Sequence, residues 1–174
     1  MLTHPVEPIF NEKSEMLILG TFPSVKSREM CFFYSHPQNR FWRVMASICN
    51  CDIPETVEDK KQMILSNNFA LWDVIHSCDI EGSSDSSIRN VVPNDINIIL
   101  KHSRVSRIFV NGKKAESLYK KHIEKSVGIK AIYLPSTSPA NASWNEAQLT
   151  EYWRNQILIK KYPPFCEHTQ SREC

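Results

Sequence analysis

The fold is decided by a stretch that begins Val105-Ser-Arg-Ile-Phe-Val-Asn111, runs through residues 113–125 and ends Ile129-Lys-Ala-Ile-Tyr-Leu134. Its two ends are short apolar runs, which predict buried strands, and Gly112 stops the first of them. The residues between them carry apolar side chains at helical spacing. A strand, a helix and a second strand in this order predict neighbouring parallel strands in a sheet that helices cover.

The same alternation continues on both sides of this stretch. Towards the N-terminus, Met16-Leu-Ile-Leu-Gly-Thr-Phe22 and Phe69-Ala-Leu-Trp-Asp-Val-Ile75 predict two more strands. Residues 1–14 and 77–92 are expected to be polar connecting segments. Helices are expected from Pro37 onwards and over three further ranges: 54–66, 93–102 and 144–160. The pattern predicts an α/β protein, with a three-layer α-β-α arrangement around a central four-stranded, mostly parallel sheet.

Length and composition predict a single domain. The 174 residues are 41% hydrophobic and 23% charged, which is ordinary for a globular protein with a core. We expect one domain over residues 1–174, with a core at about 15–162 and a mobile tail at 163–174. The N-terminal residues lack a signal-peptide pattern, and no run of about 18 apolar residues occurs. We therefore expect a cytoplasmic monomer, nucleoid-associated in a prokaryote, without a membrane partner.

Several classes of function are disfavoured by missing motifs. The chain has four glycines and neither a G-x-G-x-x-G nor a G-x-x-x-x-G-K-[ST] motif, so nucleotide cofactors bound by such loops are not expected. Its six cysteines contain no C-x-x-C pair, which favours free thiols over a metal site. We therefore expect no cofactor and no metal. A net charge of +2 neither requires nor excludes a nucleic-acid partner, because binding needs only a local basic face.

In a parallel sheet covered by helices, the functional site lies beyond the carboxyl ends of the strands. This rule selects four loops, at residues 20–39, 73–92, 111–113 and 134–143. The first contains Gly20-Thr-Phe-Pro-Ser24 and leads into Phe33-Tyr-Ser-His-Pro-Gln-Asn39-Arg-Phe-Trp42. The last reads Leu134-Pro-Ser-Thr-Ser-Pro-Ala-Asn141. These loops contain most of the unusual motifs of the chain, so the functional site is expected there.

Together, these motifs resemble the uracil-DNA glycosylase superfamily over residues ~16–160. A strand that ends in Gly-x-x-Pro and a Pro-Ser-rich loop after the last strand are similar to the superfamily as a whole. The Tyr34–Trp42 run combined with Pro135–Asn141, and also Ser86–Asn90, resemble its hypoxanthine-DNA (deoxyinosine) glycosylase branch. The resemblance implies a uracil-DNA glycosylase-like fold and a monofunctional DNA glycosylase of base excision repair. Its partner would be DNA that contains a deaminated base, and hypoxanthine is the base that the resemblance favours.

Asn39 is the expected catalytic residue. Other branches of the superfamily place Asp, Asn or Glu inside the Gly-x-x-Pro motif to handle the attacking water, whereas this chain has Thr21 and Phe22 there. In the resembled branch that duty falls to the Asn of His-Pro-x-Asn, which is Asn39 here. We expect Asn39 in the first turn of the helix that Pro37 opens. Its amide can hold a water by a donor and an acceptor, but it cannot deprotonate that water.

The resemblance also suggests which residues contact the flipped nucleotide. Base-binding roles are expected for five residues: Thr21, Phe22, Phe33, Tyr34 and Asn111. Of these, Phe33 and Tyr34 would stack on the base, and the Asn111 amide would hydrogen-bond its edge. DNA contacts are expected for a second set: Ser24, Ser136, Thr137, Ser138, Pro139, Ala140 and Asn141. Leu134 stands where many other branches have His, which argues against His-assisted excision of uracil.

Plainer interpretations remain open for several of these residues. Asn39 can be a polar residue at a helix start, and Asn111-Gly112 an ordinary turn. The aromatic pair Phe33-Tyr34 can belong to the core. Asp73 and Asp79 suggest a pair of acids, but no second motif supports a catalytic role for them.

Other functions also remain open. A close variant is a uracil or thymine-mismatch DNA glycosylase. A small-molecule N-ribohydrolase would use the same site without DNA. A non-catalytic nucleic-acid-binding module would keep the fold and lack the chemistry.

Overall fold

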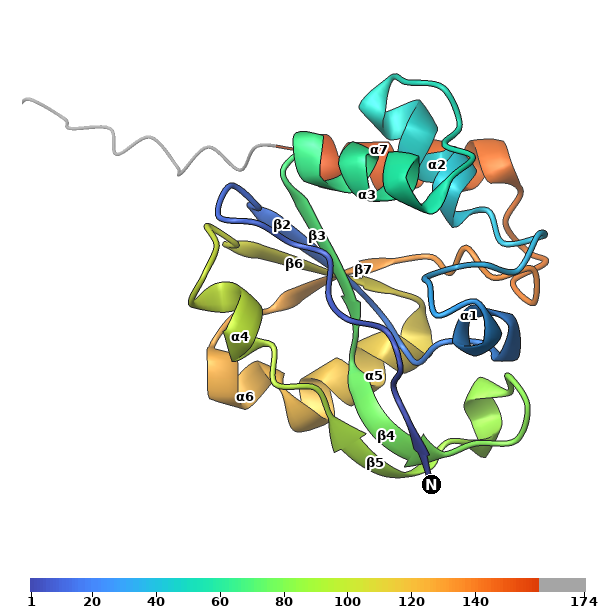
Figure 1. Cartoon of the computed structure of the whole chain (residues 1–174), viewed down its shortest axis with the longest axis vertical. Coiled ribbons are helices and arrows are strands. Elements are labelled where there is room, and N and C mark those ends of the chain that lie inside the picture. The colour runs from blue at the N-terminus through green and yellow to red at the C-terminus, as the bar shows by residue number, and fades with distance from the viewer. Residues whose placement is uncertain (160–174) are drawn as a thin grey trace, which may run out of the picture.

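The central sheet has the predicted form. The computed structural model describes residues 1–159, so the predicted tail at 163–174 lies outside the described residues. The strands of this sheet are β2 (Met16–Gly20), β3 (Phe69–Asp73), β6 (Arg107–Asn111) and β7 (Ala131–Leu134). They lie in the order β3-β2-β6-β7, and every neighbouring pair is parallel (Figure 1). Each strand falls inside the range expected from the sequence.

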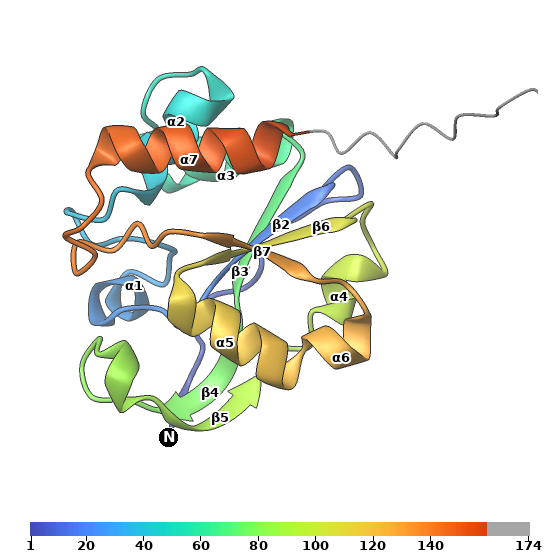
Figure 2. The same ribbon diagram turned by 180° about the vertical axis from the view of Figure 1, so that it is seen from behind.

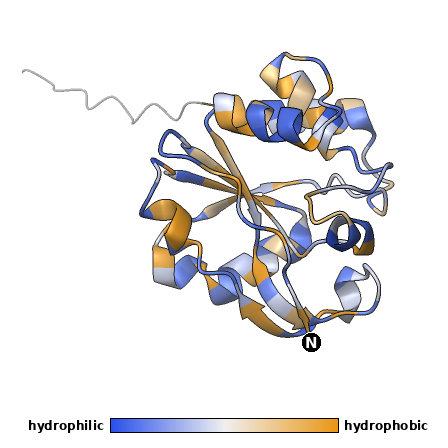
Figure 3. Ribbon diagram, viewed as in Figure 1, coloured by the Kyte–Doolittle hydropathy of each residue, from blue (hydrophilic) through white to orange (hydrophobic). Residues whose placement is uncertain are grey.

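Helices cover both faces of this sheet (Figures 1 and 2). One face carries α2 (Phe41–Cys49), α3 (Val57–Ser66) and α7 (Glu146–Leu158), and the other carries α4 (Asn97–Leu100), α5 (Lys113–His122) and α6 (Glu124–Val127). The strands are apolar on both faces, and Leu17, Ile18 and Leu19 are fully buried between the layers. The helices combine hydrophilic and hydrophobic stretches, as helices with one covered side do (Figure 3). The predicted three-layer α/β fold is confirmed.

A second, smaller sheet was not predicted. It is antiparallel, in the order β1-β4-β5, and consists of β1 (Leu2–Thr3), β4 (Ile75–Asp79) and β5 (Arg89–Pro93). The expectation that residues 1–14 and 77–92 are connecting segments is therefore wrong. The reason is that the apolar run ends at Ile75, and β4 continues with the exposed His76 and the buried but polar Ser77, so the hydrophobic pattern does not show the strand.

The pairing of β1 with β4 brings the N-terminal segment against the central sheet. His4 N donates to the His76 carbonyl at 2.7 Å, and Ile9 forms an isolated bridge with Leu71 on β3. The first ten residues therefore run alongside β3 and β4, where the dark blue and green chains lie together in Figure 1. This placement carries His4 to the carboxyl end of β3.

The helix that was expected to open at Pro37 begins later. α2 starts at Phe41 with Arg40 as its N-cap, and a turn precedes it in which Asn39 N donates to the His36 carbonyl at 2.9 Å. Asn39 therefore lies before the helix and not in its first turn. Its side chain still stabilises the helix start, because Oδ1 accepts the Phe41 N–H at 3.0 Å.

Two core tryptophans hold the loops that follow the strands. Trp42 and Trp153 are buried. Trp42 Nε1 donates to the Phe33 carbonyl at 3.2 Å, and Trp153 Nε1 donates to the Pro135 carbonyl at 2.9 Å. The core on the α2–α7 face thus fixes the backbone of both motif-bearing loops.

Candidate functional site

A cavity of about 650 Å³ opens at the carboxyl ends of the four parallel strands. All four loops selected from the sequence contribute to its lining. The predicted site residues that line it are Thr21, Phe22, Ser24, Phe33, Tyr34, Asn39, Asn111, Ser136, Thr137, Ser138, Ala140 and Asn141. Pro139, the remaining member of the predicted set, is exposed and is not part of the lining. The volume lies within the range of pockets that bind small molecules, roughly 300–1,000 Å³.

The lining has a buried part and an exposed part. We call the buried polar part the floor, which consists of Gly20, Thr21, Asp73, Asn111 and Thr137 together with the partly buried Tyr34. We call the exposed and partly exposed part the rim, which consists of Ser83, Ser84, Asp85, Ser86, Lys113, Lys114, Ser136, Ser138, Ala140 and Ser143. A flipped base would enter towards the floor, whereas a DNA backbone would remain at the rim.

Asn111 is fully engaged with its own protein. Its Nδ2 donates to the Tyr34 hydroxyl at 3.1 Å and to Thr137 Oγ1 at 3.0 Å. Its Oδ1 accepts the Thr137 N–H at 3.1 Å. Both amide protons are therefore used, and one lone pair on Oδ1 is left for a ligand. In this arrangement Asn111 ties the end of β6 to the last loop.

Tyr34 presents its hydroxyl to the floor. Its ring stacks on Phe41 with centroids 4.0 Å apart, so one ring face is covered by the protein. Burial, together with the nearby charge of Asp73, raises the pKa of Tyr34 far above its ordinary value. Because the oxygen accepts from Asn111, the hydroxyl proton remains available to donate. Tyr34 is thus a neutral donor at the floor.

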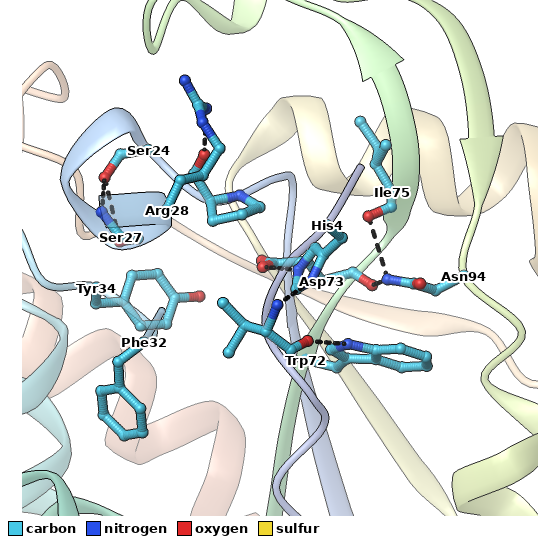
Figure 4. A network of polar contacts seen from close by, with 12 residues as sticks. His4, Ser24, Ser27, Arg28, Phe32, Tyr34, Trp72, Asp73, Ile75 and Asn94 are labelled. Carbon is cyan, nitrogen blue, oxygen red and sulfur yellow. Dashed lines mark hydrogen bonds and ion pairs between the residues drawn. The ribbon is translucent and has the colours of Figure 1, made fainter. Parts of the chain in front are cut away.

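Asp73 and His4 form a buried hydrogen-bonded pair at the end of β3 (Figure 4). His4 Nε2 lies 2.7 Å from Asp73 Oδ2, and the two side chains are 2% and 5% exposed. The other oxygen, Oδ1, lies 2.1 Å from the point where a β-carbon on Gly20 would stand. Gly20 is therefore required here because the carboxylate takes the space of its side chain.

Two further features hold this pair in place. The His4 ring packs edge-on against Phe22, with centroids 5.8 Å apart, and against Trp72, with centroids 6.3 Å apart. Asn94 is buried, and its Nδ2 donates to the carbonyls of Asp73 and Ile75 at 2.9 and 3.1 Å (Figure 4). The backbone around Asp73 is thus fixed from both sides.

Sequence reasoning missed this pair for identifiable reasons. Asp73 ends a strand in one of the selected loops, which is the same signal that led to Asn111. The sequence suggests a pair of acids, Asp73 with Asp79, and no second motif supports a catalytic role for that pair. His4 lies in a segment that was expected to be a connection, so no local signal could have found it.

Arg40 organises the last loop and was also missed. Its guanidinium and backbone N–H donate to carbonyl oxygens of that loop, which belong to Thr137, Ser138, Asn141 and Trp144. Partial burial lowers the pKa of Arg40 from its ordinary value, but the group stays cationic. The start of α2 and the last loop are therefore held together by one side chain.

The last loop offers hydroxyl donors, with one exception. Ser136 Oγ accepts the Ser138 N–H, and Ser138 Oγ accepts the Ala140 N–H, so each hydroxyl proton remains free to donate. Thr137 is fully buried, and its Oγ1 accepts from Asn111. In this arrangement the Thr137 side chain has no exposed surface with which to contact a phosphate.

The rim carries charge of both signs. Lys113 and Lys114, at the start of α5, line the cavity opposite Asp85 in the loop between β4 and β5. Desolvation raises the pKa of Asp85, and the charge of Lys114 opposes this shift. Within residues 1–159, no helix is both long enough and apolar enough to cross a membrane.

Comparison with known proteins agrees with this geometry. The family model of the uracil DNA glycosylase superfamily matches residues 7–158. This chain belongs to the uracil DNA glycosylase superfamily. It is 29% identical over 154 residues to "Hypoxanthine DNA glycosylase" of Methanosarcina acetivorans, which covers 87% of this chain and 96% of that protein. It is 30% identical over 136 residues to the protein of the same name from Methanosarcina barkeri, with 77% and 85% covered.

A solved structure is also similar. It is the solution NMR structure of a candidate uracil DNA glycosylase from Methanosarcina acetivorans, with a TM-score of 0.74 and 28% identity. The match covers 90% of this chain and 99% of that one. In this chain Thr21 and Phe22 follow Gly20, and neither side chain can act as a base.

Proposed function

We propose that this chain is a monofunctional DNA glycosylase that removes hypoxanthine from DNA. The observation that carries the proposal is the cavity at the strand ends, which combines a buried polar floor, aromatic side chains and a rim of hydroxyls and lysines. Superfamily membership and the two relatives named as hypoxanthine DNA glycosylases support the same function. Such an enzyme flips the damaged nucleotide out of the duplex and binds its base in a pocket.

The proposed reaction is a hydrolysis. The bond between C1′ and N9 breaks, and its electron pair goes to the purine, which takes a proton from solvent. A water forms the new bond to C1′ and releases a proton. The products are the free base and an abasic site, and no amine of the protein is needed.

Asn39 is the proposed residue for orienting the water. Its Oδ1 already accepts the Phe41 N–H, which fixes the plane of the amide and leaves one lone pair on Oδ1. That lone pair can accept a proton of the water, so that the oxygen of the water faces C1′. Positioning of this kind accounts for large rate effects when the reacting atoms are well aligned.

The rim is proposed to hold the DNA backbone. Ser136 and Ser138 can donate their hydroxyl protons to phosphates, and Lys113 and Lys114 supply positive charge at the same opening. Ser24, Ala140 and Asn141 line the cavity at positions compatible with this role. All of these residues belong to one chain, so we propose that a monomer is the active form, acting in the compartment that holds the DNA.

A substrate panel tests the proposal. The purified full chain is incubated with duplexes that contain hypoxanthine, uracil, xanthine or a thymine mismatch, and abasic sites are detected by alkaline cleavage. Hypoxanthine is expected to be removed fastest, without strand cleavage before alkali is added. Faster removal of uracil or thymine would favour the mismatch-specific alternative, faster cleavage of free inosine would favour a ribohydrolase, and no abasic product would leave only a binding module.

Substitution of Asn39 tests the proposed role of its amide. Asn39→Ala is expected to lower the single-turnover excision rate by roughly 100-fold, because the water loses its orientation. Binding to DNA with an abasic site should be unchanged. The neighbouring exposed residue provides the control, since Gln38→Ala should retain the full rate. Full activity in Asn39→Ala would refute the role.

A further inference from the structure

Asp73 carries an oxygen that the protein leaves unused. Its Oδ2 is bonded to His4, whereas Oδ1 has no hydrogen-bond partner among residues 1–159. In that part of the chain no fully buried side-chain oxygen or nitrogen lacks a partner, so Oδ1 is within reach of the cavity that Asp73 lines. A carboxylate oxygen with free lone pairs is an acceptor for a donor on the bound base.

The hydrogen bond from His4 determines that this oxygen acts as an acceptor. The Val6 N–H donates to His4 Nδ1 at 3.1 Å, so the proton of the ring lies on Nε2. Nε2 then donates to Asp73 Oδ2 at 2.7 Å. The carboxylate is therefore held in one orientation and offers an acceptor, and not a donor, to the cavity.

A complementary donor lies beside it. Asp73 Oδ1 and the Tyr34 hydroxyl lie 2.1 and 3.0 Å from the same point, the position of a β-carbon on Gly20. The Tyr34 proton is free to donate, as its oxygen accepts from Asn111. The floor thus presents an acceptor and a donor side by side, which matches an N–H next to a carbonyl.

The depth of this pair shows which part of a nucleotide it would meet. Asp73 is 4% exposed, whereas the proposed water-orienting Asn39 is only partly buried. The sugar stays attached to the DNA at the opening, so the far edge of the base reaches the floor. Asp73 is therefore placed for contact with the Watson–Crick edge and not for work on the water at C1′.

We propose that Asp73 recognises the ring N–H that deamination creates, with His4 as its positioning residue. This inference rests on the proposed function and names the substrate feature that the site selects. Asp73 Oδ1 accepts from N1–H of hypoxanthine, and the Tyr34 hydroxyl donates to O6. Adenine, the parent base, has a lone pair at N1 and an amino group at C6, so both contacts become repulsive. Guanine also carries N1–H next to a carbonyl. This contact therefore favours both hypoxanthine and guanine over adenine.

The same carboxylate disfavours uracil as a leaving group. A pyrimidine that leaves from N1 departs as an anion, because it has no other basic ring nitrogen to protonate. A fixed negative charge against its edge raises the energy of that anion. Hypoxanthine can leave with a proton on N7. A hydrogen bond from its N1–H to the Asp73 carboxylate increases the basicity of N7. Asp73 therefore favours a deaminated purine over a deaminated pyrimidine.

The test crosses three substrates with two enzymes. Single-turnover excision is measured on duplexes with hypoxanthine, 1-methylhypoxanthine or uracil, using the wild-type chain and Asp73→Asn. The variant has the same shape as the wild type. Its amide oxygen accepts from His4 Nε2, so its amide N–H₂ group faces the cavity. We expect the wild type to prefer hypoxanthine over both other bases. In Asp73→Asn the ratio of hypoxanthine to uracil excision should fall by roughly 10- to 100-fold, and the ratio to 1-methylhypoxanthine should fall as well.

Asp79→Asn is the matched control, because Asp79 ends β4, is half exposed and pairs with Asn90 away from the cavity. It should keep the wild-type ratios. Unchanged ratios in a folded Asp73→Asn would overturn the inference while leaving the proposed function intact. If that variant does not fold, equal wild-type rates on hypoxanthine and 1-methylhypoxanthine overturn it instead. No excision of hypoxanthine by the wild type removes the proposed function itself.

His4 is tested by the same ratios, because a purely structural residue would lower all rates together. His4→Leu removes the donor to Oδ2 and should shift the ratio of hypoxanthine to uracil in the same direction as Asp73→Asn. His4→Gln, which restores an N–H donor, should recover part of the preference. A uniform loss on all three bases, with no recovery in His4→Gln, would show that His4 does not act through Asp73.

Discussion

Asp73 and Asn111 end the two strands that flank β2, yet they are used in opposite ways. Asn111 makes three hydrogen bonds to Tyr34 and Thr137, and both of its amide protons are consumed. Asp73 makes one side-chain bond, to His4, and leaves an oxygen at the cavity. Both side chains are similar in size and burial. The difference shows that a polar residue at a strand end can serve a ligand only through the atoms that the fold leaves unbonded.

The free-energy cost of an unpaired buried donor explains why the Asn111 amide is hydrogen-bonded within the protein. A buried donor without a partner costs about 1–3 kcal/mol, so an amide at a crowded strand end is stabilised by any nearby acceptor. Thr137 supplies such an acceptor and also a backbone N–H. The Asp73 carboxylate has no protons that need an acceptor, and its Oδ1 lies at the cavity instead of being enclosed by protein.

The largest expected effect comes from Gly20, which lies between the two residues. In Gly20→Ala the new methyl group would stand 2.1 Å from Asp73 Oδ1 and 3.0 Å from the Tyr34 hydroxyl, so the floor must rearrange. We expect hypoxanthine excision to fall by 100-fold or more, as roughly 1 Å of displacement can cost that much. Overpacking should also lower the free energy of unfolding by about 1–3 kcal/mol.

Single-turnover kinetics and urea denaturation measure both effects in Gly20→Ala. Gly128→Asn is the control, because Gly128 has a left-handed backbone with open space around it and lies far from the cavity lining. Asn tolerates that conformation, so little change is expected there. Wild-type excision by Gly20→Ala would mean that Asp73 does not need its present position.

Exchanging the amide for a carboxylate at Asn111 sharpens the comparison further. Asn111→Asp cannot donate to Tyr34 or Thr137, and it adds a second buried carboxyl group to the floor. We expect the free energy of unfolding to fall by about 3 kcal/mol, since breaking a buried polar network leaves its partners unpaired. Denaturant unfolding measures this loss. Asn155→Asp, on the exposed side of α7, should stay within about 0.5 kcal/mol of the wild type.

The four strands of the central sheet could be predicted from the sequence, because burial on both faces makes the apolar runs of a parallel sheet easy to recognise. The position of the cavity followed from that, and Phe33, Tyr34 and Asn39 do line it. The partner of Asp73 could not be predicted. It lies 69 residues away and is delivered by a two-residue strand, which leaves no periodic signal.

The assignment of Asn111 illustrates a second limit of sequence reasoning. Its residue type is well suited to a base edge, and its place at a strand end is correct. What decides its use is the backbone N–H and the hydroxyl of Thr137, which depend on how the last loop folds back. Arg40 fixes that fold through loop carbonyls, and no side-chain pattern encodes such contacts.

A smaller effect on stability is expected at Thr137, which forms two of the three hydrogen bonds of the Asn111 amide. Thr137→Val has nearly the same shape but lacks the oxygen that accepts from Asn111 Nδ2. The unfolding free energy should fall by about 1–2 kcal/mol, and one amide proton of Asn111 becomes free. Thr137→Ser keeps the hydroxyl and should be closer to the wild type. If Thr137→Val were as stable as Thr137→Ser, the bond to Asn111 would contribute nothing measurable.

The smallest effect concerns Asp85, a carboxylate at the rim that has no histidine to hold it. Desolvation raises its pKa above the ordinary value, so folding disfavours its charged form. The wild type therefore loses stability as the pH rises from the ordinary pKa of an Asp through the raised value, whereas Asp85→Asn escapes this loss. Thermal unfolding should show a slightly higher midpoint for Asp85→Asn at pH 7 and no difference at pH 3. A lower midpoint at pH 7 would mean that the attraction of Lys114 outweighs desolvation, and that the charge at the rim is stabilised without a partner like His4.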